Sequence, residues 1–239
     1  MPSSSRLLRA AVTLLALAST ASAQKMAVGA PAARMVVVEL YQSQGCSSCP
    51  PANALLNRLA DRPGILPLSF AVTYWDSLGW KDTFATEQFT RRQYDYSHAN
   101  GGSVVATPQF VVDGQSIISG SQPGALEAAI GQAQTRRAAV SIIHRAGVIE
   151  LGAGRTSAPA TVWLVRYDPR ERLVSIGRGE NSGRSLPHRN IVTGLRSLGL
   201  WLGKPVAFPE PRYIDQAQRS AVLVQAARGG PILAARQLQ

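Results

Sequence analysis

The stretch Gly45-Cys46-Ser47-Ser48-Cys49-Pro50 decides how this chain is interpreted, because it holds both cysteines of the sequence. It follows directly on the apolar run 35–41, MVVVELY, and a run with helical spacing begins behind it at residue 51. A strand that ends in Cys-x-x-Cys and opens a helix is typical of a thiol–disulfide redox site. The spacing lets the two sulfurs pair, so that one cysteine can resolve a mixed disulfide formed by the other.

The two cysteines receive different predicted roles. At the mouth of a helix, Cys46 faces unpaired N–H groups and the positive end of the helix dipole, which favour the attacking thiolate. Cys49 is then the resolving residue. Ser47 and Ser48 are small enough for a substrate disulfide to approach, and their hydroxyls are placed to donate to sulfur. The alternative that the spacing leaves open is a disulfide that only staples a loop.

Thr107-Pro108 is a second, distant signal. It stands just before a predicted hairpin strand, where a proline is expected only at the strand's start. Redox proteins with the element order β-α-β-α-β-β-α place a cis proline there, against the disulfide. We therefore predict a cis peptide bond at Pro108, with an ordinary trans turn proline as the alternative.

Glu39 is the third signal, because it interrupts an apolar strand seven residues before Cys46. A carboxylate there is costly to bury unless it is paired with a cation or has a role in the chemistry of the site. Three interpretations stay open: a buried acid with a raised pKa that shuttles the proton of Cys49, a partner of Lys81, or a position on an exposed edge.

Hydrophobic periodicity divides the chain into two halves. The first half predicts the order β-α-β-α-β-β-α, with strands at 36–41, 65–74, 109–114 and 116–118 and helices at 51–60, 83–99 and 123–137. The second half predicts mostly antiparallel strands, in hairpins of 140–143 with 148–151, 161–167 with 172–176 and 221–226 with 232–235; residues 191–200 form a strand or a short helix. The predicted fold class is therefore α/β followed by an antiparallel β module.

The N-terminus has the pattern of a secretory signal peptide. Arg6 and Arg9 flank an apolar core at 10–18, and small residues at 21–23 precede Gln24. We predict three parts: a signal peptide at 1–23, a domain with the cysteines at 24–137 and a basic β-rich module at 138–239. The expected location is periplasmic or secreted, where a Cys46–Cys49 disulfide persists at rest. We expect no stable membrane insertion after cleavage.

The charge of the chain is concentrated in the second half. The formal net charge is +11, and residues 136–239 hold 16 of the basic side chains against 6 acidic ones. Such a module attracts anionic envelope components by long-range electrostatics, although a solvated, arginine-rich surface explains the same composition. The compartment and the lack of a basic–aromatic cluster argue against nucleic acid as a partner.

The segment 74–82 is dense in aromatic and charged residues. Trp75 and Trp80 are predicted to wall a substrate groove beside the cysteines. In the alternative, both tryptophans pack in the core and Lys81 pairs with an acid. The three histidines are widely spaced, which indicates no metal site of paired ligands, and we expect no cofactor.

Together these motifs make the chain similar to the secreted thioredoxin-like proteins called domain of unknown function 1223. The matching segments follow one another in order: 38–51, 74–82, 92–93, 107–114, 180–192 and 221–225. The resemblance implies a thioredoxin-like fold with a C-terminal β extension, and it supplies no activity. Pro50-Pro51 is unusual for thioredoxins and predicts a helix that starts later, so that Cys46 loses part of its dipole stabilisation.

The predicted function is thiol–disulfide exchange by an exported thioredoxin-like protein, acting through Cys46 and Cys49 on protein or small-thiol substrates. The first alternative is a non-catalytic envelope-binding protein with a structural disulfide. The second is Cu(I) handling by the two thiols, with His98 as a further ligand.

Overall fold

The computed structural model describes residues 34–212 and 215–238, so the predicted signal peptide lies outside the described part. Its helices are α1 (Cys49–Leu59), the 3-10 helix η1 (Asp76–Leu78), α2 (Glu87–Ala99) and α3 (Pro123–Gln134). Its strands are β1 (Val36–Gln42), β2 (Ile65–Ala71), β3 (Gln109–Val112), β4 (Ser116–Ser119), β5 (Ile142–Arg145), β6 (Val148–Leu151), β7 (Ala160–Asp168), β8 (Arg172–Ser175), β9 (Ser185–His188), β10 (Ile191–Trp201), β11 (Val206–Pro209), β12 (Arg219–Ala226) and β13 (Ile232–Gln237).

The element order predicted for the first half is confirmed, with η1 added after β2. Two helix starts were predicted wrongly. Helix α1 already begins at Cys49, because a proline in the first turn lacks only an N–H that has no acceptor within the helix. Helix α2 begins at Glu87 rather than at residue 83, because the Thr86 side chain accepts from the Phe89 N–H and caps the helix there.

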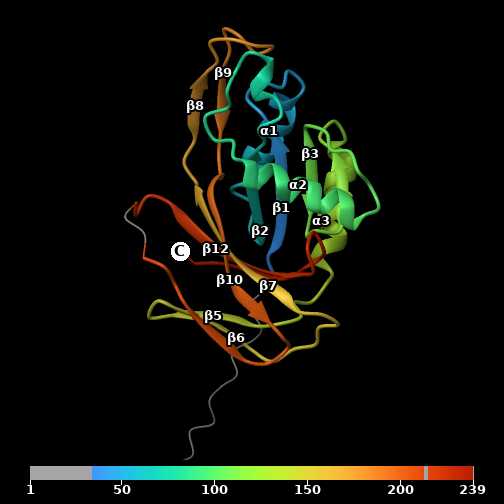
Figure 1. Ribbon diagram of the computed structural model, residues 1–239, viewed down its shortest axis with the longest axis vertical. Helices are drawn as coiled ribbons and strands as arrows, with labels where there is room; N and C mark the ends of the chain where they lie inside the picture. Colours follow the sequence, from blue (N-terminus) through green and yellow to red (C-terminus); the bar gives the residue numbers. More distant parts are fainter. Residues whose placement is uncertain (1–33, 213–214, 239) are drawn as a thin grey trace, which may run out of the picture. The chain divides into compact units, whose positions relative to one another are not determined.

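Strands of both halves join in one eight-stranded, mostly antiparallel sheet of order β13-β12-β7-β10-β2-β1-β3-β4 (Figure 1). Its parallel neighbours are β1 with β2 and β2 with β10, where Ile191 pairs with Ser69. The division at residue 137 stays a prediction.

The antiparallel character predicted for the second half is confirmed, and residues 191–201 form strand β10. The predicted hairpin of 161–167 with 172–176 is wrong. Strand β7 pairs with β10 and β12, whereas β8 pairs with β9 in a separate two-stranded ribbon. The reason is burial: β7 is buried along most of its length and needs a partner on each side, while β8 is largely exposed.

The sheet is covered on both faces. Helices α1 and α3 pack on one face of β1, and α2 packs on the other face, where its Phe89 and Tyr96 join the core. Further along the sheet, the small sheet β11-β6-β5 closes a third apolar cluster around Trp201. The β8–β9 ribbon lies beside α1 (Figure 1). Across the described residues, no helix combines the length and apolar character needed to span a bilayer.

A buried ion pair lies in the centre of this architecture. Glu39 on β1 is fully buried, and its two carboxylate oxygens accept from Arg92 Nη2 at 2.7 Å and Nε at 3.1 Å. The hydroxyls of Tyr41 and Tyr96 also donate to Glu39, at 2.7 Å and 3.1 Å. Burial by itself would lower the pKa of Arg92, but the Glu39 charge raises it well above its usual value.

We predict that Arg92→Ala lowers the free energy of unfolding by about 3–5 kcal/mol, because it leaves the Glu39 carboxylate buried without its cation. Urea denaturation measures the change. Arg145→Ala is the matched control, since Arg145 forms an exposed pair with Glu150, and it should shift the midpoint little. Equal midpoints for the two variants would contradict a structural role for the buried pair.

Candidate redox site

The two cysteines lie where β1 passes into α1. Cys49 is the first residue of α1, and its N–H donates to the Cys46 carbonyl at 3.1 Å. The Cys46 N–H in turn donates to the Ser43 carbonyl at 3.1 Å. Both thiols are free and buried, whereas Ser47 and Ser48 between them are exposed. The loop therefore presents its serines to solvent and keeps its sulfurs beneath them.

The two thiols have opposite acidities. A hydrogen bond with the Cys49 thiol lowers the pKa of Cys46 to about 6; burial opposes this shift, and the Ser48 hydroxyl, 3.2 Å from Cys46 Sγ, adds to it. Burial, followed by the bond to Cys46, raises the pKa of Cys49 well above the usual thiol range. Near neutral pH, Cys46 is thus the thiolate and Cys49 the proton-carrying partner.

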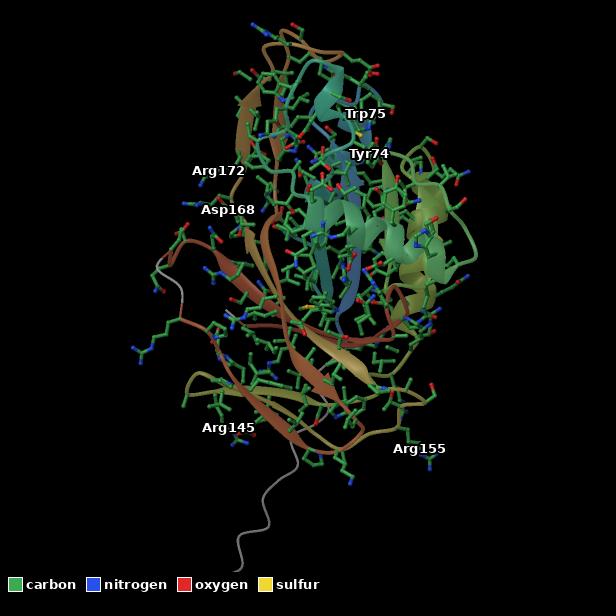
Figure 2. All side chains as sticks on the ribbon, viewed as in Figure 1. Tyr74, Trp75, Arg145, Arg155, Asp168 and Arg172 are labelled. Carbon is green, nitrogen blue, oxygen red and sulfur yellow. The ribbon has the colours of Figure 1, made fainter. Side chains whose placement is uncertain are left out.

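Thr107 and Trp75 lie next to Cys46. The Thr107 carbonyl is 3.9 Å from Cys46 Sγ, and the Trp75 indole N–H donates to the Thr107 hydroxyl at 2.7 Å. Figure 2 shows Tyr74 and Trp75 next to each other towards one end of the molecule. The Thr107–Pro108 peptide bond is cis, as predicted, and Pro108 lies directly before β3.

Residues of the segment 76–83 form hydrogen bonds with the loop 43–46. The Gln44 N–H donates to Asp82 at 2.7 Å, and the Trp80 indole donates to the Gln44 side chain at 2.9 Å. Asp82 is buried, and this burial raises its pKa to about 6 although backbone N–H groups bind it. Both predicted tryptophans thus border the site, half-buried, through their indole N–H groups. Lys81, by contrast, is exposed and makes no ion pair with any described residue.

The second half of the chain also binds the cysteine loop. Asn181 is fully buried, and its side-chain amide donates to the carbonyls of Gln44 and Cys46, at 2.9 Å each. The neighbouring Glu180 accepts from the Ser47 N–H at 3.0 Å. Both residues come from the loop between β8 and β9. This loop therefore binds the backbone around the cysteines from more than a hundred residues away in the sequence.

One turn further along α1, Asn53 connects the helix to β9. Its amide nitrogen lies 2.7 Å from the Pro187 carbonyl and 3.1 Å from His188 Nδ1. Burial lowers the pKa of His188 to about 4, so this histidine is neutral. It is a packing residue of the α1–β9 contact, and its ring also meets Phe84 edge-on.

The structure thus places eight of the candidate site residues in one region, and their roles stay predictions: Cys46, Cys49, Ser47, Ser48, Thr107, Pro108, Trp75 and Trp80. Glu39 is the exception. It lies on the α2 face of the sheet, and its partner is Arg92 rather than Lys81. Its oxygens accept from Arg92 and from the hydroxyls of Tyr41 and Tyr96, so the structure gives this carboxylate the role of an ion-pair partner rather than that of a proton shuttle. An edge position is also wrong, because β1 is a central strand.

Sequence reasoning assigned no site role to Glu180, Asn181 or Asp82. A weak signal existed, since all three lie in segments that carry the family resemblance. Among the described residues, no three His, Cys, Asp or Glu side chains are grouped for a metal ion, so His98 is not placed with the two thiols.

Comparison with known proteins identifies the chain as a member of a family. The family model described as "Protein of unknown function (DUF1223)" matches residues 37–225, and the chain belongs to this family. A crystal structure of an Agrobacterium tumefaciens protein is similar to it, with 30% identity and a TM-score of 0.70 over 87% of this chain and 96% of that one. HBP35 of Porphyromonas gingivalis shares the fold at 11% identity, with a TM-score of 0.58 over 86% of this chain and 74% of that one. None of the curated proteins matches.

We predict that the thiolate absorbance of the reduced protein titrates with a midpoint near pH 6, since Cys46 ionises above that pH. Cys49→Ala removes the largest cause of the low pKa, and the midpoint should move upward towards the ordinary thiol value. Ser48→Ala should move it less. A Cys49→Ala midpoint that stays near pH 6 would show that the Cys46 thiolate is stabilised by other groups.

We further predict that Asn181→Ala destabilises the protein by about 1–3 kcal/mol, because two backbone carbonyls of the cysteine loop lose their buried donor. The Cys46 midpoint should rise as well, since the bonds to Cys49 and Ser48 depend on the loop geometry. Thermal unfolding and the absorbance titration measure the two effects. Ser182→Ala, an exposed neighbour on the same loop, is the control. If both variants titrate like the wild type, the hydrogen bonds from Asn181 to the cysteine loop do not affect the pKa of Cys46.

Proposed function

We propose that the protein is a thioredoxin-like thiol–disulfide exchange protein that acts outside the cytoplasm. The single observation that carries the proposal is the geometry of the strand–helix junction, where the free thiols of Cys46 and Cys49 lie together and Cys46 Sγ is 3.2 Å from the Ser48 hydroxyl. This arrangement lowers the pKa of Cys46 to about 6 and raises that of Cys49. An asymmetric pair of this kind has one thiol ready to attack and another that holds its proton until it is needed.

The exchange has two steps. The Cys46 thiolate attacks one sulfur of a substrate disulfide; the substrate S–S bond breaks, a mixed disulfide forms at Cys46, and the first substrate sulfur leaves and takes up a proton from solvent. Cys49 then loses its proton and attacks Cys46 Sγ, which releases the second substrate sulfur and closes the Cys46–Cys49 disulfide. The substrate disulfide is reduced by two electrons and the protein dithiol is oxidised by two. The reverse sequence oxidises a substrate dithiol.

The surroundings of the sulfurs supply the docking surface in this proposal. The exposed Ser47 and Ser48 leave room for an extended substrate, and Thr107 and Trp75 line the other side of Cys46. The location outside the cytoplasm rests on the signal-peptide pattern of residues 1–23. An anionic envelope partner for the basic second half rests on its charge alone.

One observation favours the alternative of a structural disulfide in a non-catalytic binding protein. Cys46 and Cys49 are 0% and 1% exposed. A substrate therefore reaches Cys46 Sγ only after the residues packed over it have moved. A buried bridge that only constrains the chain needs no such access.

The reduction potential of the pair separates the two functions, and equilibration in glutathione or dithiothreitol buffers measures it. Because a low thiol pKa stabilises the reduced form, we expect a potential above about −270 mV, in the range of working redox proteins. Cys49→Ser should trap a mixed disulfide with glutathione at Cys46, visible by mass spectrometry, while the matched control Cys46→Ser should not. A potential below about −300 mV, without trapping, would mark a structural bridge.

A further inference from the structure

A second cavity lies on the α2 face of the sheet, apart from the cysteines. It has a volume of about 420 Å³ and opens between α2, the strands β7, β10 and β12 and the turn after β12. Its principal side chains are Arg91 and Arg92 from α2, Trp163 from β7, Leu195 from β10 and Arg228 from the turn. Cavities of about 300–1,000 Å³ with a mostly apolar lining and a few polar groups are typical of small-molecule sites.

The floor of this cavity, which we call the arginine groove, is the Arg92 guanidinium. A guanidinium has five N–H donors. Four of them are used in bonds to Glu39, Tyr96 and Gln225. The remaining Nη1 hydrogen has no acceptor among the described residues. The guanidinium also lies 5.8 Å from the Trp163 ring, so a cation and an aromatic surface adjoin on one wall.

The groove carries one uncompensated positive charge. Glu39 neutralises Arg92, and Asp95 pairs with Arg228 at 2.8 Å. Arg91 is exposed at the rim and forms no hydrogen bond or ion pair with the described part of the chain. Its side chain is therefore available to a ligand without the loss of an existing bond.

The turn after β12, which borders the groove beside α2, is held in place before any ligand binds. Gly229 has a φ of +69° and packs so closely on α2 that a Cβ there would collide with the Asp95 carbonyl oxygen. The Gln225 side chain donates to the Gly230 carbonyl at 2.8 Å and fixes the same turn. A preformed wall lowers the ordering cost of binding.

We propose that the arginine groove binds a small organic anion with a flat apolar body, such as an aromatic carboxylate or sulfonate. The body lies against Trp163 and Leu195, and the anionic group pairs with Arg91 and accepts from the free Nη1 hydrogen of Arg92. Aromatic stacking and charge-assisted hydrogen bonds are the interactions that this lining offers. The site is independent of the thiols, since neither cysteine lines it.

The test is a fluorescence titration of the whole protein with 8-anilinonaphthalene-1-sulfonate at low ionic strength. We expect saturable binding at one site, weakened by salt. Arg91→Glu reverses the free charge at the rim and should weaken binding tenfold or more, about 1.4 kcal/mol at least. Arg155→Glu is the matched control: Arg155 is likewise exposed and unpaired among the described residues, and Figure 2 shows it at the end of the molecule away from Trp75.

A second variant tests the groove without changing its charge. Ser197→Phe narrows the space beside Trp163 and should abolish binding, with circular dichroism as the check on folding. The proposal is overturned if the wild type shows no saturable binding, or if Arg91→Glu and Arg155→Glu bind alike. Neither result affects the proposed exchange function, which is measured at the cysteines.

Discussion

The buried pair of Glu39 and Arg92 is the constraint on which the rest of the structure depends. It joins the central strand β1 to α2, and through Gln225 it reaches β12 in the second half. A charge pair in the core is tolerated only when each charge is paired and hydrogen-bonded, and the two tyrosines supply the remaining bonds. The pair fixes the position of helix α2 on the sheet. Gln93, which follows Arg92 in α2, donates to the Ala106 carbonyl just before Thr107 and so connects the helix to the cysteine site.

The same dependence on contacts between distant segments appears around the two cysteines. The cysteines come from the first half, but the donors that hold the backbone of their loop come from the second, through Asn181 and the ribbon that carries it. Helix α1 is likewise bound to β9 through Asn53. The second half therefore contributes residues to the site. Among its arginines, Arg189 forms a surface ion pair with Asp61, and Arg228 pairs with Asp95 and also lines the cavity.

Local patterns in the sequence predicted what local physics determines. The apolar run before Cys46, the spacing of α1 and the turn after β3 each act over a few residues, and each was recognised. The partner of Glu39 was missed because Arg92 is fifty-three residues away, and an arginine in a polar helix gives no sign that it is buried. The pairing of β7 was missed for a related reason: a turn signal at residues 168–171 marks a reversal without specifying which strands pair. Asn181 acts through a backbone contact that no periodicity encodes.

The parallel pairing of β2 with β10 has a consequence for the order in which the chain is made. One edge of β2 stays open until residue 191 has been synthesised, because Ile191 is its partner there. An open strand edge is a template for pairing with other chains. The first half alone would therefore carry an unpaired edge on β2, and the sheet is completed there only by β10.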